Sequence, residues 1–108
     1  MIYLASPYSH VDPAIREQRY LGALAALKKL LDQGRWTYSP IVHCHDLSIR
    51  FDLAWDAKFW EQYDRHMIRS ARTVIVLTLP GWDVSVGVTA ERAYAERLGM
   101  SIEMMEPV

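Results

Sequence analysis

Residues 73–79 read Thr-Val-Ile-Val-Leu-Thr-Leu, and this stretch indicates the fold more clearly than any other. β-Branched and apolar side chains follow one another without the alternation that is typical of a half-exposed strand. A strand of this kind is covered on both faces, as the central strand of a parallel sheet is. We therefore expect a sheet that contains 73–79 and carries helices on both faces.

The rest of the chain predicts further strands and helices around this segment. Short apolar runs predict three more strands, at 2–5, 36–39 and 100–104. Helices are predicted at 13–33, from 52 or 56 to about 71, and at 85–98, whereas 41–51 is interpreted as a loop with some helical turn. Because strands and helices alternate, we expect an α/β fold with a small doubly wound parallel sheet of about four or five strands, of the Rossmann or flavodoxin type.

The helix predicted at 13–33 has clear signals at both ends. Asp12 can cap it, proline at 13 suits the first helical position, and Gly34 ends it. Its larger apolar residues predict the side that faces the sheet: Ile15, Leu21, Leu24, Leu27 and Leu31.

Length and composition limit the class of protein. The 108 residues fit one domain, about half of them are apolar, and the formal charge is −1. This balance argues against a binder of nucleic-acid polymers or membranes. Cys44 is the only cysteine, so no internal disulfide can form and a reducing compartment is expected. No signal peptide or membrane-length apolar run is evident, so we expect a cytoplasmic protein.

Two carboxylates lie on the apolar sides of predicted helices. The residues that share the side of Glu91 are apolar or small: Gly87, Val88, Tyr94, Ala95 and Leu98. Asp64 repeats the pattern in the preceding helix, beside Trp60, Met67, Ile68 and Ala71. A carboxylate that faces a core must be hydrogen-bonded, paired, neutralised or turned toward a cleft. Two such groups in different environments can serve as nucleophile or base and as general acid.

Each of these residues also has a structural interpretation. Asp64 and Glu91 can be buried acids that are satisfied by hydrogen bonds or by an arginine. Tyr3, in the predicted strand at 2–5, can be a core tyrosine whose hydroxyl binds a polar partner. In the functional interpretation, the Tyr3 hydroxyl holds Glu91 in its reactive position.

The loops after the strands carry the candidate binding residues, because ligands of such folds bind beyond the carboxyl ends of the strands. Ser85 is most simply the N-cap of the last helix, but its hydroxyl and the N–H groups of the turn through Gly87 could hold a phosphate. Ser6 and Ser9 could add hydroxyls from the facing loop. Among the four tryptophans, Trp82 is the best placed to stack on a nucleobase.

The sequence His43-Cys44-His45-Asp46 resembles a metal cluster only at first sight. Its spacing fits no established zinc pattern, and no second ligand pair is evident. We expect His43 and His45 to have a structural or substrate-contact role, and we expect no metal and no cofactor.

Three segments resemble the nucleoside 2-deoxyribosyltransferase superfamily. Residues 2–8, Ile-Tyr-Leu-Ala-Ser-Pro-Tyr, resemble its opening strand and loop, and Asp64 resembles the aspartate in the helix before its central strand. Residues 85–91, Ser-Val-Gly-Val-Thr-Ala-Glu, resemble its Ser/Asp-x-Gly-x-x-x-Glu element. With Leu-Pro-Gly-Trp at 79–82, the chain is most similar to a small group of bacterial and phage proteins in this superfamily.

The resemblance implies one nucleoside deoxyribosyltransferase-like domain over 1–108 and assigns roles to its residues. Glu91 would be the nucleophile, Tyr3 would orient it, and Asp64 would assist the leaving base. The serine version of the element is similar to that of the 2′-deoxynucleoside 5′-monophosphate N-glycosidases, in which this serine contacts the 5′-phosphate; here it is Ser85. Relatives close their pockets with a neighbouring subunit, so a homodimer or larger homo-oligomer is expected.

We therefore expect cleavage of an N-glycosidic bond, or base exchange, on a nucleoside 5′-monophosphate or nucleoside. A second possibility is a nucleotide-binding or sensing module without turnover. A third is a glutamate-dependent NAD glycohydrolase, which release of nicotinamide would reveal.

Overall fold

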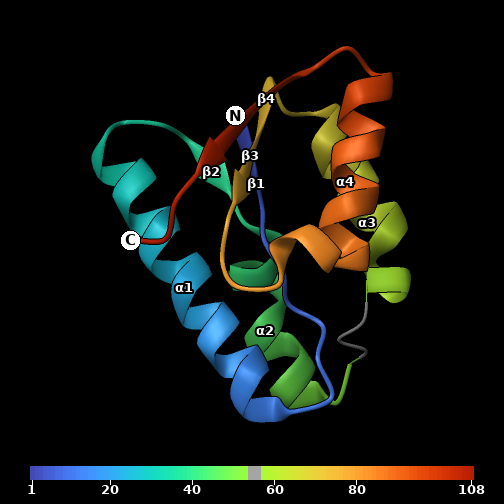
Figure 1. The fold of residues 1–108 in the computed structure, drawn as a ribbon. Helices are drawn as coiled ribbons and strands as arrows, with labels where there is room; N and C mark the ends of the chain where they lie inside the picture. The colour runs from blue at the N-terminus through green and yellow to red at the C-terminus, as the bar shows by residue number, and fades with distance from the viewer. Residues whose placement is uncertain (54–56) are drawn as a thin grey trace.

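The computed structural model describes residues 1–53 and 57–108 and contains one four-stranded parallel sheet (Figure 1). The strands lie in the order β2-β1-β3-β4. Their bounds are Ile2–Ala5 for β1, Thr37–Tyr38 for β2, Thr73–Leu77 for β3 and Ser101–Met105 for β4. The predicted α/β fold is confirmed, with four strands, and β3 is an inner strand that pairs with β1 on one side and β4 on the other.

Strand β3 contributes to a core on each face of the sheet. Val74 and Val76 lie in one core and Ile75 and Leu77 in the other, and all four side chains are buried. Complete burial of such side chains contributes about 1.5–3 kcal/mol each. This two-sided burial is the reason that the segment is apolar throughout rather than alternating.

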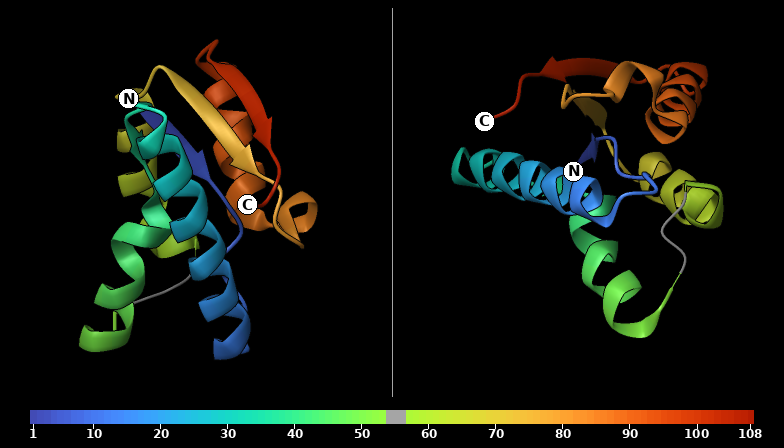
Figure 2. Two further views of the ribbon diagram at one scale, coloured as in Figure 1. Left: turned by 90° about the vertical axis from the view of Figure 1, so that its left-hand side faces the viewer. Right: turned by 60° about the horizontal axis from the view of Figure 1, so that its bottom comes forward.

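Helices cover both faces (Figures 1 and 2). On one face, α1 (Pro13–Asp32) packs through Ala26 and Leu30. On the other face, α3 (Ala57–Arg69) and α4 (Val86–Arg97) pack through residues that include Ile68 and Val88. Helix α2 (Pro40–Phe51) packs mainly on α1, below the carboxyl ends of the strands in Figure 1. The structure is therefore doubly wound, with helices on both faces of the sheet.

The interpretation of 41–51 as a loop was wrong, because these residues form α2. Proline occupies the first position of α2, and the Ser39 hydroxyl oxygen accepts a hydrogen bond from the Val42 N–H at 3.2 Å. Serine followed by proline is a helix start. The predicted strand ended at residue 39, and the proline that follows it was not recognised as a helix start. Asp52 ends α2 in a left-handed conformation and opens no helix, and Asp56 lies outside the described residues.

The side of α1 that faces the sheet was also predicted wrongly. The buried residues are Ala23, Ala26 and Leu30, whereas three of the predicted core leucines are exposed: Leu21, Leu24 and Leu31. Of the others, Leu27 packs against the core and Ile15 is half-buried. Alanine allows a helix to approach a sheet closely, so the side with small residues lies inside and the larger side chains point outward.

The segment before α4 positions its N-terminus. Gly81 adopts a φ of 93°, which favours glycine, and a single 3₁₀ turn over Trp82–Val84 follows it. Ser85 then caps α4 by accepting a hydrogen bond from the Val88 N–H at 3.2 Å. The predicted helix start at Ser85 is confirmed. No helix in the described part of the chain has both the length and the apolar character needed to cross a membrane.

Candidate active site

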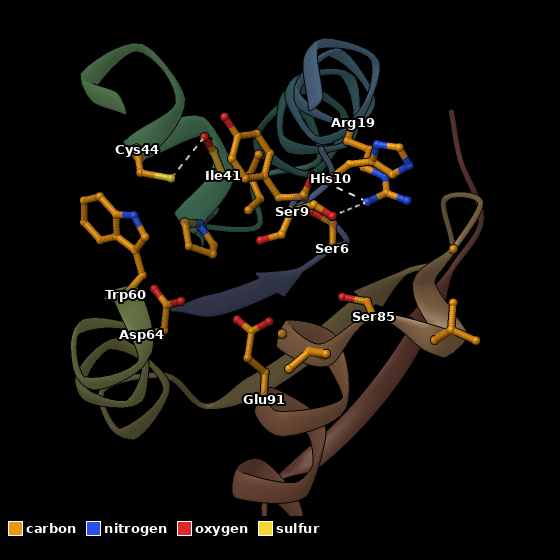
Figure 3. A pocket seen from close by; sticks show the side chains of 16 residues that line it. Ser6, Ser9, His10, Arg19, Ile41, Cys44, Trp60, Asp64, Ser85 and Glu91 are labelled. Atoms are coloured by element: carbon orange, nitrogen blue, oxygen red, sulfur yellow. Dashed lines mark hydrogen bonds between the residues drawn. The ribbon is translucent and has the colours of Figure 1, made fainter. Parts of the chain in front are cut away.

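A cavity of about 500 Å³ lies at the carboxyl edge of the sheet (Figure 3). The loops after β1 and β3 and parts of all four helices line it. Six of the ten predicted site residues are among the lining residues: Ser6, Ser9, Asp64, Ser85, Gly87 and Glu91. These residues come from distant parts of the chain, and the parallel strand ends bring them together, as expected for this fold.

Glu91 is bound to the sheet by a hydrogen bond. The Tyr3 hydroxyl, at the centre of β1, donates to Oε2 of Glu91 in α4. Tyr3 is completely buried beneath α3 and α4, so its ring has little freedom to move. This bond fixes one oxygen of the Glu91 carboxylate, and in Figure 3 the carboxylate points into the cavity. The Tyr3–Glu91 contact that the sequence analysis expected is present.

Asp64 faces the same space from α3. In Figure 3 the carboxyl groups of Asp64 and Glu91 rise from two helices and both point into the cavity. Oδ1 of Asp64 is buried and has no hydrogen-bond partner among the described residues. A buried, unpaired carboxyl oxygen is unfavourable unless it is protonated or a ligand satisfies it. Asp64 is thus suited to donate a proton to a bound molecule.

The two carboxyls favour a shared proton. Burial raises the pKa of Asp64 from 3.8 to about 7. Burial, and then the nearby charge of Asp64, raise the pKa of Glu91 from 4.5 to about 8, against a lowering by the Tyr3 hydrogen bond. The pair therefore binds a proton near neutral pH. Because Tyr3 donates to Glu91 and no described residue donates to Oδ1 of Asp64, the negative charge is better placed on Glu91 and the proton on Asp64.

A polar region lies around the N-terminus of α4. Helix starts present N–H groups without intrahelical partners, and the helix dipole adds positive potential there. Ser85 and Gly87 line the cavity at this point. Arg19 lines it from α1 and donates to the carbonyl oxygen of Ser9 at 2.9 Å. Within residues 1–53 and 57–108, Arg19 forms no ion pair with a carboxylate, so its charge is available to an anion.

Ser6 adds an unsatisfied hydroxyl to the cavity. Its side chain is buried, and its Oγ has no hydrogen-bond partner among the described residues. Ser9, next to it in the same loop, is exposed and also lines the cavity. The loop after β1 therefore places the Ser6 hydroxyl in the cavity wall without a partner among the described residues, and the binding role of the two serines stays a prediction.

Three predicted contact residues do not line this cavity. Trp82 packs against the core beneath α4, with the Arg92 guanidinium 5.6 Å from its ring centre. His43 is exposed and stacks on Tyr63. His45 is buried at the interface of α1 and α2, where it hydrogen-bonds both Tyr8 (2.7 Å) and Glu17 (2.8 Å). No group of three or more potential metal ligands occurs among the residues that the structure describes.

Sequence reasoning missed several lining residues, of which Arg19 and Trp60 matter most. Arg19 precedes Ala23, Ala26 and Leu30 on the buried side of α1, so the correct helix side would have placed it toward the site. Trp60 precedes Asp64 by one helical turn, and that spacing placed both on one side of α3. The sequence analysis assigned Trp60 to the core, although in the structure it also faces the cavity.

A second cavity, of about 370 Å³, opens between α3 and α4. It shares Asp64, Gly87 and Glu91 with the first. Its other lining groups include Arg65, whose guanidinium lies 5.1 Å from the ring centre of Tyr94. The carboxyl pair is therefore accessible from two sides.

The sequence of residues 1–107 matches the family described as Domain of unknown function (DUF1937), and the chain belongs to this family. The comparison with curated proteins found no match.

Proposed function

We propose that this protein cleaves the N-glycosidic bond of a nucleoside 5′-monophosphate or nucleoside, or exchanges its base, with Glu91 as the nucleophile. The observation that carries the proposal is the pair of carboxyls in one cavity, of which Glu91 is bound by Tyr3 and Asp64 has an unpaired oxygen. Their different hydrogen-bonding environments suit the two different roles that this reaction requires.

The reaction would proceed in two displacements. The Glu91 carboxylate attacks the anomeric carbon of the sugar while the bond to the base nitrogen breaks, and the proton on Asp64 passes to the departing base. A glycosyl ester on Glu91 results. Water or a second base then attacks the same carbon, the ester bond breaks, and the Glu91 carboxylate is restored. The proton released by the attacking group returns to Asp64.

The polarity of the cavity supports the orientation of such a substrate. In Figure 3, Trp60 and Cys44 lie at the end that holds Asp64, whereas Arg19, His10 and Ser85 lie toward the other end. Glu91 lies between the two ends. A base at the first end, a sugar over Glu91 and a 5′-phosphate near Arg19 would each meet groups of suitable chemistry. The resemblance of residues 85–91 to the glycosidase element favours the same substrate class.

A second candidate function is a cytoplasmic nucleotide-binding module without turnover. The observation that favours it is the raised pKa of Glu91, since a protonated carboxyl does not attack carbon. In that case the cavity would bind the nucleotide and release it unchanged. Substitution of Glu91 would then leave affinity largely intact, and no free base would appear.

The test is an assay of base release from a panel of ribo- and deoxyribonucleoside 5′-monophosphates, the free nucleosides and NAD. We expect release from at least one nucleotide, and loss of at least about 10³-fold of the rate in Glu91→Gln and Glu91→Ala. The matched control is Glu96→Gln, an exposed glutamate of the same helix, which should keep the wild-type rate. Addition of a labelled second base would distinguish exchange from hydrolysis. Binding of a nucleotide without any release would contradict the enzyme and favour the binding module.

A further inference from the structure

Helix α1 is apolar on two opposite sides. Its inner side packs on the sheet and on α2 through residues that include Ala23, Ala26 and Leu30. Its outer side carries three leucines that are 51%, 39% and 48% exposed: Leu21, Leu24 and Leu31. A helix on the surface of a monomer has a polar outer side, whereas a helix that is apolar all round is covered on all sides. Nothing in residues 1–53 or 57–108 covers these leucines.

We propose that a second copy of this chain covers the outer side of α1, with the two α1 helices antiparallel about a two-fold axis. This surface, called here the α1 seam, consists of Glu17, Leu21, Leu24 and Lys28. These four residues recur at intervals of four, three and four positions, so they form one stripe along the helix. The proposal does not rest on the proposed function.

The charges on the α1 seam favour a second copy of the chain in an antiparallel orientation. In an antiparallel pair with the axis between Leu21 and Leu24, each Leu21 lies opposite Leu24 of the partner subunit. The same register sets each Glu17 opposite Lys28 of the partner subunit, and both side chains are partly exposed beside their partners within the chain, His45 for Glu17 and Asp32 for Lys28. A parallel pair would instead oppose like charges. A membrane-binding helix would carry mainly cations beside its apolar stripe, whereas this stripe has one acid and one base.

The α1 seam also lies close to the wall of the cavity. The Glu17 carboxylate is 2.8 Å from Nε2 of His45, and Nδ1 of that ring is 2.7 Å from the hydroxyl of Tyr8, which lines the cavity. Arg19, two positions from Glu17, lies on the opposite side of the helix and faces the cavity. The partner therefore lies behind the wall of the site and does not occlude its opening.

The first test is the oligomeric state, measured by sedimentation velocity over a concentration series. One helix pair is a small interface, so we expect a dimer whose Kd is in about the micromolar range. Leu21→Glu/Leu24→Glu should be monomeric at every concentration and should keep the wild-type circular dichroism, because both side chains are exposed. A wild-type monomer, or a dimer that persists in this variant, would overturn the proposal.

The second test concerns the register. Glu17→Lys and Lys28→Glu should each weaken self-association by about tenfold, because each variant sets like charges opposite one another. An equimolar mixture of the two variants should associate about as tightly as the wild type, since both opposed pairs then have opposite charges. Lys29→Glu, the same change one residue outside the seam, is the control and should dimerise normally. A mixture no tighter than either variant alone would overturn the antiparallel register, whatever the protein catalyses.

Discussion

At the scale of single residues, the Tyr3–Glu91 hydrogen bond joins a buried core residue to the proposed nucleophile. Tyr3 is completely buried in β1, and its hydroxyl donates to the Glu91 carboxylate. Burial, and then the charges of Glu91 and Asp64, raise the pKa of Tyr3 well above 10, so the phenol stays protonated and donates. It therefore stabilises the charged form of Glu91 that the proposed attack requires.

Tyr3→Phe removes this donor and changes little else in volume. We expect the rate of base release to fall by about 10- to 100-fold, because the Glu91 carboxylate loses a hydrogen-bond donor that stabilises its charge. The acid limb of the pH–rate profile should also move to higher pH, since loss of the bond raises the pKa of Glu91. Tyr63→Phe, at an exposed tyrosine whose hydroxyl contacts His43, is the control. An unchanged profile in Tyr3→Phe would show that Tyr3 is only a core residue.

The anomalous residues were recognisable from sequence because a carboxylate on an apolar helix side is unusual in itself. This predicted the direction of Glu91 and Asp64, and the contact with Tyr3 was one of two interpretations of that tyrosine. It did not predict the surroundings of Trp82, His43 or His45, because a loop tryptophan or a histidine pair carries no periodic signal that says which way the ring points. The partners of His45 come from α1 and from the loop after β1, and only the assembled fold brings them together.

At the scale of elements, the turn before α4 determines how an anion would meet Arg19. A Cβ atom added at Gly81 would lie 2.7 Å from Nη2 of Arg19, and Gly81 has a φ of 93°. Gly99, at the end of α4, has a φ of 71° with no atom near its missing Cβ. Both glycines have a positive φ, but only Gly81 lies against a side chain, that of Arg19.

Gly81→Ala and Gly99→Ala are therefore a matched pair. Each should lower the free energy of unfolding by about 1–2 kcal/mol, because alanine is strained at positive φ. Only Gly81→Ala should also weaken binding of a nucleoside 5′-monophosphate, by about 3- to 30-fold, through displacement of Arg19. Isothermal titration at a temperature where both variants are folded measures the difference. Equal affinities in the two variants would show that Arg19 does not contribute to binding of the phosphate.

Helix α2 was missed because the residues that begin it also end the preceding strand. Ser39-Pro40 ends β2 and begins α2 at once, and the Ser39 hydroxyl is the acceptor at the helix start. The buried side of α1 was predicted wrongly for a different reason. The larger apolar side chains were expected to face the sheet, but the residues that do so include Ala23 and Ala26. Order and type of the other elements were predictable because caps, glycine stops and apolar strands are local signals.

Ser39→Ala tests the start of α2. Loss of the cap should cost about 1 kcal/mol and lower Tm by about 4–8 °C in a domain of this size. The control is Ser70→Ala, at an exposed serine whose hydroxyl donates to the His66 carbonyl oxygen. A Tm equal to that of the control would show that proline at position 40 and packing against α1 are enough to start the helix.

At the scale of the whole molecule, the carboxyl pair links stability to pH. The ordinary pKa values of these carboxyls are 4.5 for Glu91 and 3.8 for Asp64, whereas burial in the folded protein raises the pKa values of the pair to about 8 and about 7, so that the pair holds its last proton, which the hydrogen bonds favour on Asp64, to near neutral pH. Between these limits the folded state binds more protons than the unfolded state, so stability falls as pH rises. Ionisation of these buried carboxyls therefore lowers the free energy of unfolding near neutral pH, and interactions in the rest of the fold offset this cost.

Thermal melts from pH 5 to pH 8.5 measure this linkage. We expect the Tm of the wild type to fall by several degrees across the window, at about 4–8 °C per kcal/mol. Glu91→Gln should flatten the dependence and exceed the Tm of the wild type at pH 8, because the amide never needs to ionise. A decline in Glu91→Gln as steep as that of the wild type would mean that the Glu91 pKa is not raised.

The central claim is that Glu91 forms a covalent bond with the sugar, and peptide mass spectrometry tests it most directly. The protein would be incubated with a 2′-fluoro analogue of the nucleotide that it cleaves, so that the glycosyl ester forms and persists, then digested and sequenced. We predict a mass increase equal to the fluorinated sugar phosphate on Glu91, matched by one equivalent of released base. One equivalent of base with an unmodified Glu91, or with the adduct on Asp64, would contradict the account.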